Sequence, residues 1–340
     1  MTVGHPIWLD QLTDAERDLL LPGLAEPLDR APDVLIVGGG MLGLATATAC
    51  VRDRFGSVVV VERDRLGAGA SGGAAGLLMP EVHEGVDPPA LVDLARLSLD
   101  AWRELEQTWP GGVGLLDLDV AGHRQARVNP LRALVRLAGG LPSVSTGVSA
   151  LAVSTEAGRV TTVQTSAGEF RPAHVVFATG LPPRLDGLTL DVPATEVKGH
   201  MLASKPTPMA APEVVADIAK VIEDGRLLIG GTLDLDDHER VVRDEVVERM
   251  WAEVVALWPA AREVGIGYRW ACFRPAHPDR LPVIDRVPSL SNAWLTSGHY
   301  KTGILNAAAT GRALAAWMRT GERPPEVASF SLSRLLEPAS

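Results

Sequence analysis

The feature that most constrains the fold is a glycine-rich turn between two β-branched runs. Directly after Asp33, the residues Val-Leu-Ile-Val at 34–37 form a continuous apolar run of the kind that is buried on both faces of a parallel sheet. They lead into Gly-Gly-Gly-Met-Leu-Gly at 38–43, and an Ala- and Leu-rich helical pattern then continues to about Arg54. A second apolar run over 58–61 ends at Glu62. Strand, helix and strand fit within about 30 residues, so the sequence predicts a βαβ unit.

The spacing of the glycines in this turn is typical of a dinucleotide-binding site. Gly38 permits the tight turn, Gly40 lets the backbone approach a pyrophosphate, and Gly43 allows the helix to pack closely on the strand. The helix N-terminus then offers amide groups and the positive end of its dipole to the phosphates. We expect Glu62 to accept hydrogen bonds from the adenosine ribose hydroxyls. The candidate cofactor-binding residues of this unit are Gly38, Gly40, Met41, Leu42, Gly43, Glu62 and Arg63.

The composition excludes several classes of protein. Hydrophobic residues make up 46% of the 340 residues and charged residues 22%, which is typical of a folded chain. The formal net charge of −10 is unfavourable for binding a phosphate backbone, so we expect no nucleic-acid partner. Cys50 and Cys272 cannot form a disulfide framework and lack the spacing of metal ligands, so we expect no metal.

The N-terminal sequence shows no basic segment followed by an apolar one, as a secretory signal would. The longest weakly polar run, Val34–Cys50, is interrupted by glycines and is shorter than a membrane span. We therefore expect a cytoplasmic protein with no membrane partner.

The rest of the chain alternates helical and strand-like patterns without an internal repeat. A nucleotide-binding unit stands at the start, and a helix that could complete it stands near the end, which predicts two interleaved domains. The expected helices cover 13–22, where Thr13 and Glu16 form a capping-box pattern, 88–108, 129–138, 243–257 and 303–319. The expected strands lie within 147–178 and over 193–204, 213–222, 226–232, 266–273 and 293–296.

A long loop of small residues follows Glu62. Small side chains let a chain run against a flat ligand, and a serine hydroxyl can hold a phosphate oxygen. The choice between a nicotinamide and a flavin dinucleotide depends on this loop together with the segments that follow it. The candidate cofactor-binding residues of the loop are Ala70, Ser71, Ala75, Gly76 and Leu77.

Three later segments extend the pattern. They are Val175–Gly180, Arg274–Ile284 with the form Arg-Pro-x-x-x-Asp-x-x-Pro-x-Ile, and Ser297–Leu305 with the form Gly-His-x-x-x-Gly-Ile-Leu. Together with the glycine-rich turn they match, in order and spacing over about 33–320, the D-amino-acid oxidase superfamily of flavoproteins. The chain most resembles its glycine oxidase and sarcosine oxidase branch.

The resemblance implies an α/β fold of two interleaved domains. A Rossmann-like domain would bind FAD, and an α+β domain built on an antiparallel sheet would bind the substrate. The expected boundaries are 1–30 for an N-terminal extension, 31–84, 126–192 and 281–325 for the FAD-binding domain, and 85–125 and 193–280 for the substrate-binding domain.

The implied cofactor is FAD, held without a covalent bond. An alternative stays open, because Cys272 falls in the register where monomeric sarcosine oxidases attach FAD through a cysteine. Free amide groups at the start of the 303–319 helix, with Lys301 nearby, would stabilise negative charge on the N1–C2=O edge of the flavin. The remaining candidate cofactor-binding residues are Val148, Thr179, Gly180, Gly298, Lys301, Thr302, Gly303, Ile304 and Leu305.

The resemblance also assigns candidate catalytic residues. Arg274 would grip a substrate carboxylate through two parallel hydrogen bonds. Lys301 stands where the family has an arginine, which keeps the charge and loses the planar fork. His299 either shapes the pocket or caps the turn, and Tyr300 completes the set. The family's substrate-domain tyrosine is missing from 214–221, where Ile218 argues for a roomier, more apolar pocket.

These residues imply an FAD-dependent amine oxidase. Hydride would pass from an N–CH2–COO⁻ carbon to flavin N5, the imine would hydrolyse, and O2 would be reduced to hydrogen peroxide. A roomier pocket suits an N-substituted glycine such as an N-carboxymethyl amino acid, oxidised in a biosynthetic pathway. The expected partners are this small-molecule amine and O2, and a homo-oligomer stays open.

Three alternatives remain. A dehydrogenase of the same fold would pass electrons to an acceptor other than O2, and a flavin-binding protein without catalysis would keep the cofactor residues alone. An NAD-dependent dehydrogenase would share the first 62 residues, but the later flavin-loop segments argue against it. Among residues without an assigned role, we expect Cys50, Trp102 and Trp109 to lie in the core and His123, His200 and His238 to be scattered polar residues.

Overall fold

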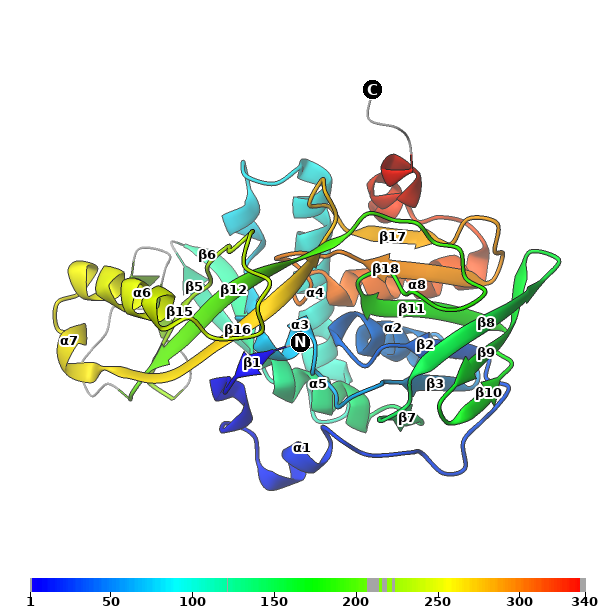
Figure 1. The fold of residues 1–340 in the computed structure, drawn as a ribbon, viewed down its shortest axis with the longest axis horizontal. Coiled ribbons are helices and arrows are strands. Elements are labelled where there is room, and N and C mark those ends of the chain that lie inside the picture. Colours follow the sequence, from blue (N-terminus) through cyan, green and yellow to red (C-terminus); the bar gives the residue numbers. More distant parts are fainter. Residues whose placement is uncertain (1, 121, 207–213, 216–218, 222–223, 337–340) are drawn as a thin grey trace.

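The computed structural model describes residues 2–120, 122–206, 214–215, 219–221 and 224–336. A six-stranded sheet lies at its centre (Figure 1). Neighbouring strands are parallel, except that the two strands at one edge, β17 (Val283–Arg286) and β18 (Ala293–Ser297), are antiparallel to each other. In order across the sheet the strands are β17, β18, β11 (His174–Gly180), β2 (Val34–Val37), β3 (Val58–Val61) and β7 (Val144–Ser145).

The predicted βαβ unit is confirmed as β2, α2 (Met41–Arg52) and β3. All four residues of β2 are buried, and they divide between two apolar clusters. Val34 and Ile36 lie in the cluster that includes α2, whereas Leu35 and Val37 lie in the cluster on the other face. Since both faces of the sheet are covered, β2 needs apolar side chains at every position rather than at alternate ones.

The C-terminal part of the chain completes this unit. Strand β18 pairs with β11, and α8 (Ala307–Thr320) packs along α2, as Figure 1 shows. The two helices approach so closely that a Cβ atom at Gly311 would lie 2.6 Å from the carbonyl oxygen of Ala45. The sheet that carries the glycine-rich turn is therefore built from both ends of the chain.

A second six-stranded sheet is antiparallel and extends away from the first (Figure 1). Its two long strands, β12 and β16, pair over their whole length, and α6 covers one face. The order across this sheet is β1 (Val3–Gly4), β16 (Ile266–Ala276), β12 (Thr195–Ser204), β15 (Leu227–Gly230), β14 (Ala219–Val221) and β13 (Val214–Val215), with α6 at Asp244–Leu257.

One expected strand is wrong in detail. The run over 213–222 is not a single strand, because β13 and β14 pair with each other as the two arms of a hairpin. Ile218, which we expected to line the pocket, lies outside the described residues.

The N-terminal segment contacts both the antiparallel sheet and the loop of small residues. Strand β1 pairs with β16, the backbone N–H of Thr2 donates to the carbonyl of Ala68 at 3.1 Å, and Trp8 Nε1 donates to the carbonyl of Ala74 at 2.8 Å. Thr13 forms the expected capping box, but α1 covers Asp14–Asp18 and is shorter than the helix expected over 13–22. The segment thus joins the edge of the antiparallel sheet to the loop of small residues.

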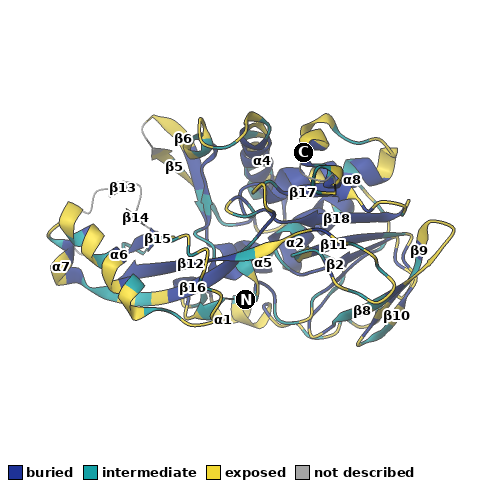
Figure 2. Cartoon of the chain, turned by 45° about the horizontal axis from the view of Figure 1, so that its top comes forward, coloured by how far each residue is buried: buried dark blue, intermediate teal, exposed yellow. Residues whose placement is uncertain are grey.

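The other elements surround these two sheets. Figure 2 shows that α6 and the short helix α7 (Ala261–Val264) lie at one end of the molecule and carry many exposed residues. Two small antiparallel sheets have the orders β10-β9-β8 and β4-β6-β5, of which β4, β5 and β6 were not expected. No helix of the described part is long and apolar enough to span a bilayer. The remaining bounds are α3 Ala70–Gly73, α4 Pro89–Thr108, α5 Pro130–Gly139, α7 Ala261–Val264, β4 Leu77–Leu78, β5 Leu115–Val120, β6 His123–Val128, β8 Ala150–Glu156, β9 Arg159–Thr165 and β10 Gly168–Phe170, with 3-10 turns at Ile7–Leu9, Pro80–His83, Pro325–Phe330 and Leu332–Leu335.

Candidate active site

The turn between β2 and α2 has no room for a side chain at Gly38 or at Gly43. Gly38 has a φ of +122°, and a Cβ atom there would lie 2.4 Å from the carbonyl oxygen of Ala178 on β11. A Cβ atom at Gly43 would lie 1.9 Å from the carbonyl oxygen of Gly38. At Gly40, by contrast, the nearest atom to such a Cβ is Ser71 Oγ at 3.4 Å. Gly40 therefore leaves open space at the helix N-terminus, where the backbone can approach a phosphate group.

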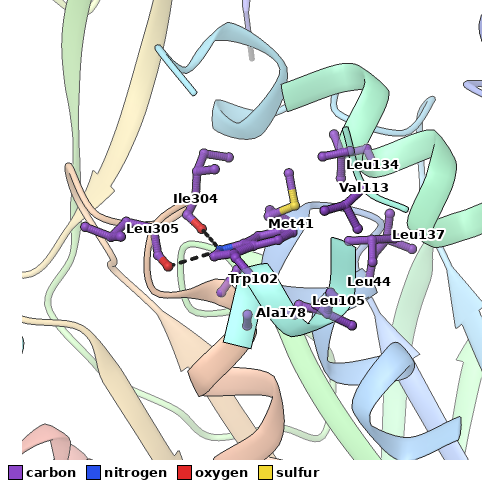
Figure 3. Close-up of a cluster of buried hydrophobic side chains, with 14 of the residues drawn as sticks. Met41, Leu44, Trp102, Leu105, Val113, Leu134, Leu137, Ala178, Ile304 and Leu305 are labelled. Carbon is purple, nitrogen blue, oxygen red and sulfur yellow. Dashed lines mark hydrogen bonds between the residues drawn. The ribbon is translucent and has the colours of Figure 1, made fainter. Parts of the chain in front are cut away.

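The first turn of α2 presents its backbone rather than its side chains. The N–H of Met41 donates to Ser71 Oγ at 3.1 Å, which joins the helix N-terminus to α3 in the loop of small residues. The Met41 side chain is fully buried beside Trp102 (Figure 3), and Leu42 is half-buried. Trp102 Nε1 donates to the carbonyl oxygens of Ile304 and Leu305 at 3.1 and 3.2 Å. This core contact links the 303–305 segment to the nucleotide turn.

Glu62 at the end of β3 is held by backbone amides. Its Oε2 accepts from the N–H of Gly39 at 2.7 Å, and its Oε1 accepts from the N–H of Asp64 at 2.9 Å. The backbone carbonyl of Glu62 accepts from the N–H of Val148 at 2.8 Å, so the buried Val148 lies beside it. The Arg63 side chain is exposed and lies 3.5 Å from the Asp64 carboxylate. The carboxylate of Glu62 therefore points toward the glycine-rich turn and is held there by these backbone amides.

The loop of small residues lies between the two sheets. Ala70 and Ser71 begin the short helix α3, and Ala75 is half-buried. Gly76 has a φ of +71°, and a Cβ atom there would lie 2.1 Å from the carbonyl oxygen of Val128. Leu77 follows in β4. Since Ser71 contacts the N-terminus of α2, this loop and the glycine-rich turn form one continuous surface.

The segment that follows β18 joins the ends of two other strands. The N–H of Gly298 donates to the carbonyl of Gly180 at the end of β11 at 2.9 Å. The N–H of Tyr300 donates to the carbonyl of Pro275 near the end of β16 at 2.8 Å. Thr179 is exposed, and its hydroxyl donates to a carbonyl two residues later. Residues 298–305 therefore lie where the parallel and antiparallel sheets meet.

The expected helix over 303–319 begins later than predicted, at Ala307. The buried side chain of Thr302 donates to the carbonyl of His299 at 3.0 Å, and the N–H of Thr302 donates to the same oxygen at 2.9 Å. These bonds form a turn, so the helix cannot start at residue 303. Three successive amide groups, those of Gly303, Ile304 and Leu305, donate to no acceptor among the described residues.

A further group next to these amides lacks a hydrogen-bond partner. The side chain of Asn306 is fully buried, and neither of its amide atoms has a partner in the described part of the chain. Buried polar groups are rarely left unpaired in folded proteins. Together with the free amides of 303–305, Asn306 fits a polar ligand in this segment, and the negative N1–C2=O edge of a reduced flavin is such a group.

His299 is buried and neutral. Its Nε2 lies 2.8 Å from Thr296 Oγ1, and its Nδ1 has no partner among the described residues. Burial, reinforced by the nearby His277, lowers the pKa of His299 to about 3. The Tyr300 hydroxyl is likewise buried without a partner in the described part, while Lys301 is exposed with Nζ 5.3 Å from the Tyr300 ring centroid. Lys301 is thus the basic side chain of this segment.

Arg274 lies half-buried on β16 without a carboxylate partner in the described part of the chain. Its Nη1 donates to the carbonyl oxygen of Thr232 at 2.9 Å. A Cβ atom at Gly199 would lie 2.0 Å from Nη1, and one at Gly231 would lie 2.6 Å from Nη2. The guanidinium therefore crosses β12 over a glycine, and its remaining N–H groups are free to bind an anion.

Cys272 lies on the same strand, next to the loop of small residues. A Cβ atom at Gly73 would lie 2.5 Å from Cys272 Cβ, and Trp270 Nε1 donates to the carbonyl of Gly73 at 2.9 Å. Burial raises the pKa of the Cys272 thiol above its usual value. Because the thiolate is the nucleophilic form, burial favours the expectation of a non-covalently bound FAD over attachment through Cys272.

The expectation for His200 is wrong. His200 is not one of the scattered polar residues, because it is fully buried on β12 and both ring nitrogens have partners, Asp234 and the N–H of Arg243. His123 and His238 are exposed. The expected core residues Cys50, Trp102 and Trp109 are buried.

Comparison with known proteins identifies the family. The family described as FAD dependent oxidoreductase, DAO, matches residues 33–119 and 120–317. The chain belongs to this family. FAD is therefore its cofactor, and the glycine-rich turn with the unpaired amides of 303–305 fits that molecule. No group of three or more His, Cys, Asp or Glu residues that could hold a metal ion occurs in the described residues.

Individual relatives of this DAO protein include oxidases and dehydrogenases. It is 27% identical over 336 residues to glycine oxidase from Pseudomonas putida, which covers 82% of this chain and 92% of the relative. It is 32% identical over 204 residues to D-amino acid dehydrogenase from Xanthobacter autotrophicus, covering 57% of this chain and 48% of the relative. The fold matches the crystal structure of glycine oxidase from Geobacillus kaustophilus with a TM-score of 0.73 at 22% identity, covering 90% of this chain and 99% of that one.

Proposed function

We propose that this protein oxidises amines of the glycine type, which carry a carboxylate on the carbon that is oxidised. The observation that carries the proposal is the Arg274 guanidinium, which lies half-buried without a carboxylate partner among the described residues. The match to a glycine oxidase over most of both chains supports it. An arginine fork binds a carboxylate in a bidentate manner, so the carboxylate is the natural handle for such a substrate.

The parallel sheet and its loops would hold the cofactor. The turn at Gly38 and Gly40 and the N-terminus of α2 would bind the pyrophosphate, and Glu62 would bind the adenosine ribose. Lys301 and the free amides of 303–305 would face the flavin edge that gains negative charge. When bound, FAD would supply a two-electron acceptor for the amine, and O2 would then take up the two electrons with two protons to give hydrogen peroxide.

The other residues would orient the amine and exclude water. Arg274 would fix the carboxylate, and hence the adjacent C–H bond, against the cofactor. His299 is neutral and buried, so it would shape the pocket rather than supply a charge. The amine would bind in its neutral form, and no general base in the pocket would then be needed.

We further propose the division of the chain that the sequence suggests. Residues 31–84, 126–192 and 281–325 would form the FAD-binding domain, and 85–125 and 193–280 the substrate-binding domain. The topology supports this division, because the parallel strands fall in the first set and the long antiparallel strands in the second.

The substrate that fits best is an N-substituted glycine such as an N-carboxymethyl amino acid, oxidised in a biosynthetic pathway. Residues 214–221 contain no tyrosine that would confine the pocket to a small amine. A panel of glycine, N-methylglycine and N-carboxymethyl amino acids tests this directly. A kcat/KM that rises with the size of the N-substituent supports the proposal, and a preference for free glycine contradicts it.

The reaction is tested by absorption spectra of the purified, FAD-loaded protein. Spectra are recorded before and after N-methylglycine is added without oxygen, and again after air is admitted. We expect the flavin band to bleach with the amine and to return with release of hydrogen peroxide. R274A should bleach far more slowly, while R262A, a change of an exposed arginine in α7, should behave as the wild type. Bleaching without rapid return in air would indicate a dehydrogenase, and no bleaching by any amine of the panel would overturn the proposal.

A further inference from the structure

The Arg274 guanidinium is anchored to a short segment that follows β15. Its Nη1 donates to the carbonyl of Thr232 at 2.9 Å, and the N–H of Thr232 donates to the carbonyl of His200 at 3.2 Å. Further along, the N–H of Asp234 donates to the carbonyl of Lys198 at 2.9 Å. Residues 232–234 therefore run beside β12, on the edge opposite β16. From there the Thr232 carbonyl accepts a hydrogen bond from Arg274, whose side chain crosses β12.

The side chains of the same segment form a closed network. The hydroxyl of Thr232 accepts from the N–H of His200 at 2.8 Å and donates to Asp234 Oδ2 at 2.5 Å. The same carboxylate oxygen lies 2.8 Å from His200 Nδ1. The side chains of Thr232 and Asp234 are thus bonded to each other and to His200, which fixes the position of the Thr232 carbonyl.

The contacts of His200 determine where its proton lies. The backbone N–H of Arg243 donates to Nε2 at 3.0 Å, so Nε2 is an acceptor and the proton is on Nδ1. Nδ1–H then donates to Asp234. The His200 side chain is fully buried and Asp234 is 18% exposed, so the carboxylate receives two hydrogen bonds at a largely desolvated position. Fully satisfied buried networks of this kind hold their members rigidly.

We propose that Thr232, Asp234 and His200 are positioning residues that set the plane of the Arg274 guanidinium for a carboxylate. The inference rests on the proposed function, in which Arg274 binds that carboxylate. With Nη1 bonded to the Thr232 carbonyl, the Nε and Nη2 groups, which have no partner among the described residues, keep a fixed direction. A fork held in this way loses little further side-chain entropy when the substrate binds.

The test compares T232V, which removes the hydroxyl and keeps the shape, with T232S, which keeps the hydroxyl. Both are measured as FAD-loaded proteins with N-methylglycine and with N-methylethylamine, which lacks the carboxylate. Binding of methoxyacetate, a carboxylate without an oxidisable amine, is followed by the change in flavin absorption. Thermal unfolding and flavin content are measured in parallel.

We expect T232V to raise the KM for N-methylglycine and the Kd of methoxyacetate about tenfold, with kcat within about twofold of the wild type. The ratio of kcat/KM for N-methylglycine over N-methylethylamine should fall by about the same factor, and T232S should restore it. A structural role alone would lower activity on both amines together and would move the unfolding temperature.

Two results would overturn the inference: wild-type methoxyacetate affinity in T232V, or an equal loss on both amines. If T232V does not retain FAD, D234N provides the same test, since it weakens the acceptor shared by Thr232 and His200.

R274A separates this inference from the proposed function. If R274A binds methoxyacetate normally, the proposed function fails. If R274A loses binding while T232V and D234N do not, only the positioning network fails.

Discussion

A Cβ atom at Gly199 would lie 2.0 Å from Nη1 of Arg274, so the guanidinium occupies the space that a glycine on the neighbouring strand leaves free. Gly199 pairs with Cys272, two residues from Arg274 on β16, so the long arginine side chain lies diagonally across β12. The position of the arginine side chain thus depends on the glycine, although the two residues are 75 positions apart in the sequence.

The first prediction follows from this pair. Gly199→Ala should displace the guanidinium and lower kcat/KM for N-methylglycine by about 10- to 100-fold, because a misplaced arginine cannot meet both carboxylate oxygens. Steady-state kinetics on the FAD-loaded variant measure the effect. Gly139→Ala, at the end of α5 with its nearest neighbour 3.8 Å from the new Cβ, is the control and should leave the kinetics unchanged. Wild-type kinetics in Gly199→Ala would show that Arg274 does not act from this position.

Arg274→Lys tests whether the fork matters beyond the charge. The ammonium group keeps the positive charge but loses the two parallel N–H donors. We expect the KM for N-methylglycine to rise about 30-fold or more and kcat to fall less. The kinetics of a carboxylate-free amine serve as the internal reference. Equal KM values for the wild type and Arg274→Lys would mean that a point charge is sufficient.

Glu62→Gln tests the orientation of the residue at the end of β3. The carboxylate accepts from the backbone N–H groups of Gly39 and Asp64, and an amide can accept through one oxygen alone. We expect the Kd of FAD to rise about tenfold, measured by titrating the apoprotein with FAD and following flavin fluorescence. Glu263→Gln, an exposed position in α7, is the control. An unchanged Kd in Glu62→Gln would remove Glu62 from the cofactor site.

Gly43→Ala tests the packing of α2 on β2. Its Cβ would lie 1.9 Å from the carbonyl oxygen of Gly38, a backbone atom that cannot move aside without opening the turn. We expect loss of most bound flavin and a free energy of unfolding lower by about 2 kcal/mol or more. Absorbance of the purified protein and urea denaturation measure the two effects. Full flavin content in this variant would contradict the close packing.

The pH dependence of stability follows from His299. Its pKa is about 3 in the folded protein and 6.5 as an ordinary histidine, so the unfolded chain takes up a proton that the folded protein does not. Its contribution to stability is complete above about pH 6.5 and is lost as the pH falls toward 3, by at most about 1.4 kcal/mol per pH unit. Urea denaturation at several pH values should show a shallower decline for His299→Gln, whose side chain does not titrate. Parallel curves for the two proteins would contradict the low pKa.

The nucleotide-binding unit could be predicted from the sequence because its constraints are local. The turn at Gly38, the packing at Gly43 and the bond between Glu62 and Gly39 all fall within one βαβ segment. Steric limits on a short turn leave few alternatives to glycine, so the pattern is visible without a structure. Arg274, by contrast, is predicted from the resemblance of the 274–284 segment to a family motif and not from its surroundings.

The surroundings of Arg274 could not be predicted, because they depend on pairing between distant strands. Gly199, Thr232 and Asp234 carry no local signal, and they meet only when β12 lies between β16 and the segment after β15. For the same reason, the sequence alone predicts His200 to be one of the scattered polar residues. A lone histidine between apolar residues has no visible partner until Asp234, 34 positions later, is brought beside it.

The start of α8 shows a different limit. The apolar run after Gly303 favours a helix from residue 303 onward, but the bonds of Thr302 to His299 close a turn there first. A helical pattern shows which residues can be helical, and capping contacts decide where the helix begins.

The joining of α2 with α8 and of β11 with β18 has a consequence for synthesis. Residues 33–62 leave the ribosome long before residues 293–320, so the first βαβ unit emerges without α8, and β11 emerges without β18. The apolar face of α2 and the free edge of β11 remain exposed during translation, when such surfaces are prone to misassembly. A chain that stops before α8 should therefore accumulate as aggregate rather than as a small flavoprotein.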